Sequence, residues 1–158
     1  MEHTYAIFEA GYGIMNEHQL AMGESTCAAR FWAAPPAGGG QARMEVREMS
    51  KIALERCKTA RCAIELMGGL AEQYGYYTAD WSGGDNSKGE GGEALTVIDP
   101  EEAWVFHVLS DDTRTSAVWA AQRVPDDHVR NMELFSRPFC LYLPFLSDVC
   151  LKRENVIR

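Results

Sequence analysis

The sequence predicts an α+β fold in which antiparallel sheets pack on each other and helices lie outside them. Two observations predict it. Amphipathic helical periodicity is confined to the middle of the chain, and short apolar runs separated by tight turns lie before and after it. A chain of 158 residues has the length of one domain. The expected order is therefore a hairpin, two helices and a three-stranded meander.

Two amphipathic helices are predicted between residues 44 and 75. In the first, Met44 to Cys57, apolar residues recur every three or four positions with charged residues between them. The second begins after Thr59, whose hydroxyl can cap it, and ends at Gly75, a suitable C-cap. Gly68 and Gly69 each lower helix propensity by about 1 kcal/mol relative to Ala, so they indicate close packing against a neighbour. The simplest arrangement is an antiparallel helix pair.

Five β-rich runs are predicted. Thr4 to Glu9 and Gln19 to Thr26 enclose a short turn-rich connection and predict an antiparallel hairpin. The other three, joined by tight turns, predict an antiparallel meander: Ala94 to Ile98, Ala103 to Leu109 and Thr115 to Val124. Because the run at 103–109 is almost entirely apolar, we expect both faces of its sheet to be covered. Residues 78–93 are rich in glycine and predict a loop. Residues 130–158 show no helical or strand periodicity of useful length.

Composition excludes several classes of function. The chain has 15 basic and 23 acidic side chains and a net charge of -8, which argues against binding nucleic acid or an anionic membrane. Its longest apolar run, Phe139 to Leu146, is too short to span a bilayer. The histidines are scattered and the glycine-rich loops lack a phosphate-binding motif, so we expect neither a metal nor another cofactor.

The five cysteines are odd in number and lack C-x-x-C spacing. Helical geometry would place Cys57 and Cys62 on different faces. We therefore expect reduced thiols that act as small hydrophobic residues, which favours a reducing compartment such as the cytoplasm. The first residues do not form a signal peptide.

Several short sequence motifs, in a fixed order along the chain, resemble the dipeptidase A and secernin family of N-terminal-nucleophile cysteine peptidases. They are GIMNEHQ and GEST (13–19 and 23–26), ALERCKTAR (53–61), GEA and DPEEAWV (92–94 and 99–105) and WAAQRVP (119–125). The resemblance covers residues 4–129. It implies a partial αββα sandwich, two antiparallel sheets between helix layers, over residues 1–129. Residues 130–158 would be a divergent tail and not a separate domain.

The resemblance also implies hydrolysis of dipeptide amide bonds by a thiol at the mature N-terminus, with the α-amine as its base. The chain has no Cys, Ser or Thr at position 1 or 2. We therefore expect a fragment that lacks the nucleophile and is inactive alone. The alternative is a non-catalytic fragment or pseudoenzyme that acts as an interaction module. The expected partner is a dipeptide or another small amide substrate; the oligomeric state stays open.

The resemblance places substrate or oxyanion contacts at Asn16 and on the strand residues Glu24, Ser25 and Thr26. Glu24 could bind the α-ammonium group of a dipeptide. The structural alternatives are that Asn16 supports a turn with positive φ and that Glu24 is a solvated strand residue. Arg123 could bind a substrate carboxylate through its guanidinium fork, or form a structural salt bridge to Asp99 or Glu101.

One competing arrangement lies within the chain. Cys27 directly follows the predicted site residues and could act as a nucleophile with His18, His107 or His128 as its base. Such catalysis needs the thiol and an imidazole to be adjacent in space. The sequence does not decide whether they are.

Overall fold

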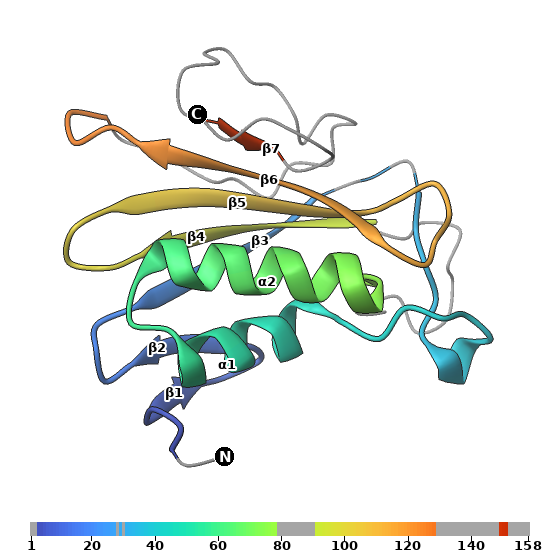
Figure 1. Ribbon diagram of the computed structural model, residues 1–158, viewed down its shortest axis with the longest axis horizontal. Coiled ribbons are helices and arrows are strands. Elements are labelled where there is room, and N and C mark those ends of the chain that lie inside the picture. The colour runs from blue at the N-terminus through green and yellow to red at the C-terminus, as the bar shows by residue number, and fades with distance from the viewer. Residues whose placement is uncertain (1–2, 28, 30, 79–90, 129–148, 152–158) are drawn as a thin grey trace.

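The computed structural model describes residues 3–27, 29, 31–78, 91–128 and 149–151. Its strands form a seven-stranded antiparallel sheet in which each strand lies beside the next one along the chain. Two α-helices lie side by side across one face of this sheet (Figure 1). The predicted α+β class and the antiparallel pairing are therefore confirmed.

The predicted N-terminal hairpin has one strand more than expected. Its strands are β1 (Ile7–Glu9), β2 (Gly13–Asn16) and β3 (Ala21–Cys27). Gly13 lies in β2 and not in a turn, and its lack of a side chain allows β2 to pack closely against a helix. Its N–H donates to Ser50 Oγ at 3.0 Å, and a Cβ at Gly13 would lie 2.8 Å from Leu54 Cδ1. The glycine is thus needed because β2 runs directly beneath α1 (Val46–Arg56), the helix that contains Ser50 and Leu54.

The predicted meander is confirmed. Its strands are β4 (Gly92–Ile98), β5 (Ala103–Ser110) and β6 (Ala117–Val124); β4 pairs along its full length with β5, and β5 along its full length with β6. The last strand, β7 (Val149–Leu151), pairs with β6, so part of the tail in which we expected no strand joins the sheet. The predicted loop at 78–93 falls largely outside the described residues.

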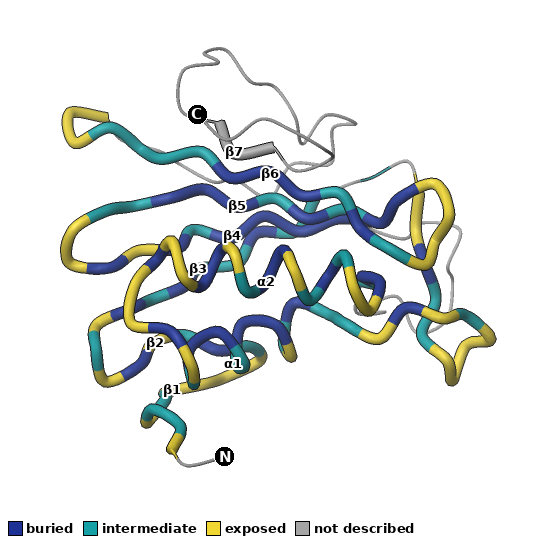
Figure 2. Tube along the Cα trace, in the orientation of Figure 1, coloured by how far each residue is buried: buried dark blue, intermediate teal, exposed yellow. Residues whose placement is uncertain are grey.

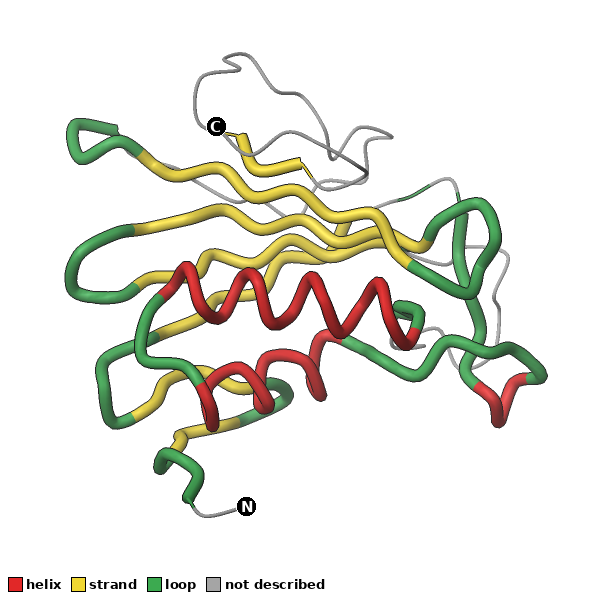
Figure 3. Tube along the Cα trace, viewed as in Figure 1, coloured by secondary structure: helices red, strands yellow, loops and turns green. Residues whose placement is uncertain are grey.

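Both predicted helices are present, as α1 (Val46–Arg56) and α2 (Ala60–Tyr74), and they run antiparallel (Figure 3). A one-turn 3-10 helix, η1 (Pro36–Gly38), lies in the connection before them. Thr59 Oγ1 accepts a hydrogen bond from the N–H of Cys62, and Gly75 has φ 73°, as the two caps predict. No described helix is long and apolar enough to cross a membrane.

The core lies between the sheet and the helices. In β5, Trp104, Phe106 and Val108 alternate with less buried residues and face the helices, and the buried positions follow the inner sides of α1 and α2 (Figure 2). The other main core side chains come from both layers: Leu20, Met22, Met49, Leu54, Ile64, Met67, Leu95, Val97 and Trp119.

The opposite face of the sheet carries a row of paired residues, Ser25, Ala94, His107 and Ala120. The described residues contain one sheet and one helix layer. The sheet-on-sheet packing that we expected is therefore not present in this part of the chain.

Gly68 provides a test of the packing between α2 and β6. A Cβ there would lie 2.6 Å from Trp119 Nε1, whereas one at Gly69 meets nothing within 4 Å. We expect Gly68→Ala to lower the free energy of unfolding by about 1–3 kcal/mol through overpacking. Gly69→Ala, the matched control, should raise it by up to about 1 kcal/mol through helix propensity. Urea denaturation checks both; equal effects of the two substitutions would contradict the prediction.

Candidate functional site

The predicted site segment lies on β3, which has one paired edge and one largely open edge. β4 pairs with β3 from Ala21 to Cys27, but β2 pairs with it only at Ala21. Beyond that point the N–H of Glu24 donates to Tyr12 Oη at 3.1 Å, in place of a strand partner. No described strand pairs with the rest of this edge.

The alternation of the strand separates the three predicted site residues. Glu24 and Thr26 point to the helix side, and Thr26 Oγ1 donates to Glu24 Oε1 at 2.9 Å. Ser25 points to the opposite face and is buried. The structure therefore brings Glu24 and Thr26 together but places Ser25 on the other face of the sheet.

Two further polar residues accompany Glu24 that sequence reasoning missed. Glu93 lies directly opposite Thr26 on β4 and is 1% exposed. Tyr76 is fully buried, and burial, followed by the charges of Glu93 and Glu24, raises its pKa well above 10.0. The available signal was a single charged residue within the apolar run at 92–98. Glu93 and Glu24 thus lie near enough to Tyr76 for their charges to act on it.

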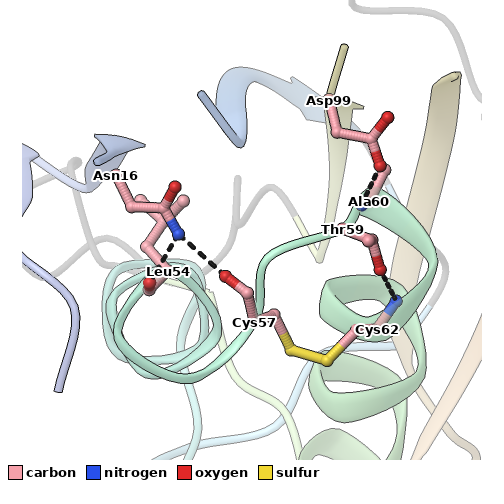
Figure 4. Close-up of a disulfide and its surroundings, with 7 residues drawn as sticks. All are labelled: Asn16, Leu54, Cys57, Thr59, Ala60, Cys62 and Asp99. Carbon is pink, nitrogen blue, oxygen red and sulfur yellow. Dashed lines mark hydrogen bonds between the residues drawn. A yellow bond between two sulfur atoms is a disulfide. The ribbon is translucent and has the colours of Figure 1, made fainter. Parts of the chain in front are cut away.

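Asn16 joins the turn after β2 to the end of α1. Its Nδ2 donates to the carbonyl oxygens of Leu54 and Cys57, both at 2.8 Å (Figure 4). Its Oδ1 accepts from the N–H groups of His18 and Leu20. Asn16 therefore supports a turn, as its structural alternative predicted, although the positive φ of 65° is at Gln19. Its contact with a substrate stays a prediction.

The expectation that Cys57 and Cys62 are reduced is wrong, because they form a disulfide (Figure 4). The helical argument fails because α1 ends at Arg56 and Cys57 has extended φ and ψ of -110° and 145°. The chain turns back within the next residues, and the two Cα atoms come within 5.6 Å, an ordinary disulfide separation. The premise for a reducing compartment no longer holds.

Cys27 is also disulfide-bonded, so its sulfur is not a free thiolate in this structure. The three histidines considered as its base have other surroundings. His18 packs its ring on Tyr5, and His128 lies 2.7 Å from Asp127. His107 is largely buried, and this burial lowers its pKa. Among the described residues no cluster of His, Cys, Asp and Glu could hold a metal ion.

Asp99 caps α2 from the turn between β4 and β5. Its Oδ2 accepts from the N–H of Ala60, the first residue of α2, at 2.7 Å (Figure 4). Its Oδ1 accepts from the N–H groups of Glu101 and Glu102, both at 2.8 Å. Burial raises the pKa of this carboxyl, but the three N–H donors outweigh it and hold the pKa below its ordinary value of 3.8.

Arg123 takes part in ion pairs at the end of β6. Its guanidinium lies 2.9 Å from Asp126 and 3.6 Å from Glu102. The structural alternative correctly anticipated a salt bridge, but it named Asp99 or Glu101 as the partner. The contact of Arg123 with a substrate carboxylate stays a prediction.

Comparison with known families identifies the class of protein. The family model described as peptidase family C69 matches residues 3–133. The chain is thus, by family, a cysteine peptidase, a hydrolase of peptide bonds. It belongs to peptidase family C69, the dipeptidase A and secernin family. No solved structure matches it.

The disulfide yields a stability prediction. It closes a short loop at the junction of α1 and α2, and loop-closure entropy for so few residues corresponds to about 2 kcal/mol. We expect Cys57→Ser combined with Cys62→Ser to lower the free energy of unfolding by that amount in urea denaturation. The same double variant with added reductant controls for Cys27. A double variant as stable as the unsubstituted chain would contradict the prediction.

The Asp99 carboxylate yields a pH prediction. Because its pKa is lower in the folded chain than in the unfolded chain, its contribution to stability is present above about pH 5 and decreases as the pH falls through 3.8 and below. We expect Asp99→Asn to lower the free energy of unfolding by about 1 kcal/mol at pH 6 and to weaken the loss of stability on acidification. Exposed Asp112→Asn is the control. Parallel acid profiles for Asp99→Asn and the unsubstituted chain would refute this.

Proposed function

We propose that this chain supplies a substrate-binding strand to a thiol-dependent dipeptidase, and that residues 1–158 alone do not catalyse hydrolysis. The match of residues 3–133 to peptidase family C69 carries this proposal. The finer fold that we propose is the αββα sandwich of N-terminal-nucleophile hydrolases. In support, α1 and α2 lie on one face of the sheet, and within the described residues the row from Ser25 to Ala120 lies on the other face, where the sandwich would place its second sheet.

The proposed reaction is the addition of water across a peptide bond in two steps. A thiolate attacks the carbonyl carbon, and the amine leaves with a proton, giving a thioester; water then releases the acid and restores the thiol. Cys27, Cys57 and Cys62 are disulfide-bonded, so none of these three supplies this thiolate in the structure. This supports inactivity of the chain alone.

We assign recognition of the substrate's α-ammonium group to Glu24. Its Oε1 accepts from Thr26, and its Oε2 has no described hydrogen-bond donor. The side chain is half-buried beside the open edge of β3, where the backbone of a dipeptide could extend along Thr26. A carboxylate with one free oxygen in a partly desolvated place is a suitable acceptor for an ammonium group.

The alternative is a non-catalytic interaction module, which the bonded state of Cys27, Cys57 and Cys62 also favours. An assay of the 158-residue chain and of the longest reading-frame product that contains it separates the two. Under the dipeptidase proposal only the longer product hydrolyses dipeptides, and iodoacetamide abolishes its turnover. Absence of turnover in both would favour the interaction module, and alkylation-sensitive turnover by the 158-residue chain would refute its proposed inactivity.

Substitution of Glu24 tests the assignment of substrate recognition. In the active longer product we expect Glu24→Gln to raise KM for unmodified dipeptides by roughly tenfold, because a charge-assisted hydrogen bond is lost. Hydrolysis of N-acetylated dipeptides should change little. Glu65→Gln, which removes an exposed carboxylate on α2, is the matched control. If both variants keep the KM of the unsubstituted enzyme, Glu24 does not bind the ammonium group.

A further inference from the structure

A cavity of about 380 Å³ lies beside the C-terminal end of α2. Three parts of the chain line it. Gln41 and Arg43 come from the connection that precedes α1, Gln73 and Tyr74 from the last turn of α2, and Thr115 from the turn between β5 and β6. None of the residues that line it is acidic, and none comes from β3.

The walls of the cavity are held in place by backbone contacts. Gly75 has φ 73°, and a Cβ there would lie 2.7 Å from the carbonyl oxygen of Thr115 and 3.0 Å from Cα of Ala42. All three parts of the chain therefore meet at this glycine. The N–H of Arg43 donates to the carbonyl oxygen of Tyr74 at 2.9 Å. The site is thus largely formed before any ligand binds.

Arg43 differs from the other basic side chains that the structure describes. Its guanidinium is exposed, and no ion pair, hydrogen bond or ring contact engages it within the described residues. The others are engaged: Arg47 with Glu45, Lys51 with Glu9, Arg61 and Arg123 with Glu102, and Lys58 and Arg114 with the rings of Tyr5 and Trp32, and Arg56 has an interaction partner as well. In a chain of net charge -8, an unengaged arginine in a cavity without carboxylates indicates an anion site.

The C-terminal end of α2 does not oppose this charge strongly. A helix C-terminus carries partial negative charge on its free carbonyl groups. Here the carbonyl oxygens of Tyr74 and Gly75 already accept from the N–H groups of Arg43 and Met44, and that of Glu72 accepts from Ser116 Oγ at 2.8 Å. The carbonyl charge next to the cavity is therefore largely compensated.

We propose that this cavity binds a small carboxylate, of about the size of an amino acid or dipeptide. The fork of Arg43 would bind the two carboxylate oxygens, and the amides of Gln41 and Gln73 and the hydroxyl of Thr115 would contact the rest of the ligand. One guanidinium balances the single charge of a carboxylate, whereas a doubly charged phosphate would call for a second cation. This proposal does not rest on the proposed peptidase activity.

The test is a titration of the ¹⁵N-labelled 158-residue chain followed by NMR. The probes are N-acetylalanine, its carboxamide, which lacks the charge, and inorganic phosphate. We expect N-acetylalanine to shift the backbone amides of Gln41, Arg43, Gln73 and Thr115 saturably, and the other two probes to bind at least tenfold more weakly.

Substitutions then assign the charge. Arg43→Gln should raise Kd for N-acetylalanine by roughly tenfold to a hundredfold, whereas Arg56→Gln, which removes an exposed arginine at the other end of α1, should leave Kd within about twofold. Gln73→Ala should raise Kd several-fold. Unchanged thermal melting shows that each variant is folded. Equal binding of the acid and the carboxamide, tighter binding of phosphate, or an unchanged Kd in Arg43→Gln would overturn the proposal.

Discussion

The side-chain amide of Asn16 is the contact on which the placement of helices and strands depends. It is 5% exposed, and its two N–H donors and both lone pairs of its oxygen are used. A buried polar group that loses its partner costs about 1–3 kcal/mol, so the partners of Asn16 are held together. One side chain thereby fixes the turn that leads into β3 to the end of α1.

The next residues along the chain extend this junction. The disulfide between Cys57 and Cys62 closes the link from α1 to α2, and Asp99 connects the start of α2 to the turn between β4 and β5 (Figure 4). Further along α2, the contact of Gly68 with Trp119 brings that helix close to β6. The helix layer is thus attached to the sheet by polar contacts at the junction and by close packing further along, and the disulfide joins the two helices to each other.

Local sequence signals were sufficient to predict the helices, because Thr59 and Gly75 cap α2 through their own conformation and through bonds to residues nearby in the chain. The meander was predictable for the same reason, since its turns are short. The disulfide was not, because its prediction requires knowing that α1 ends before Cys57.

For the candidate site, the segment around Glu24 could be identified from the sequence. The orientation of the Ser25 side chain toward the opposite face of the sheet could not. The extra strand at Gly13–Asn16 and the burial of Tyr76 depend on what packs over them, which no local pattern records. The partners of Arg123 differ from those expected because neighbouring acidic residues in turns are equivalent in sequence and distinct in space.

The strictly sequential strand order has a consequence for how the chain folds. β4, β5 and β6 can pair through short turns, whereas β3 must find β4 across both helices and the whole segment 28–91. Closing that loop costs entropy before any contact between the two strands repays it. We therefore expect the meander to form as a nucleus on which the helices assemble, with β3 docking late. The strand that carries Glu24 would then be added to a sheet whose other side has already formed.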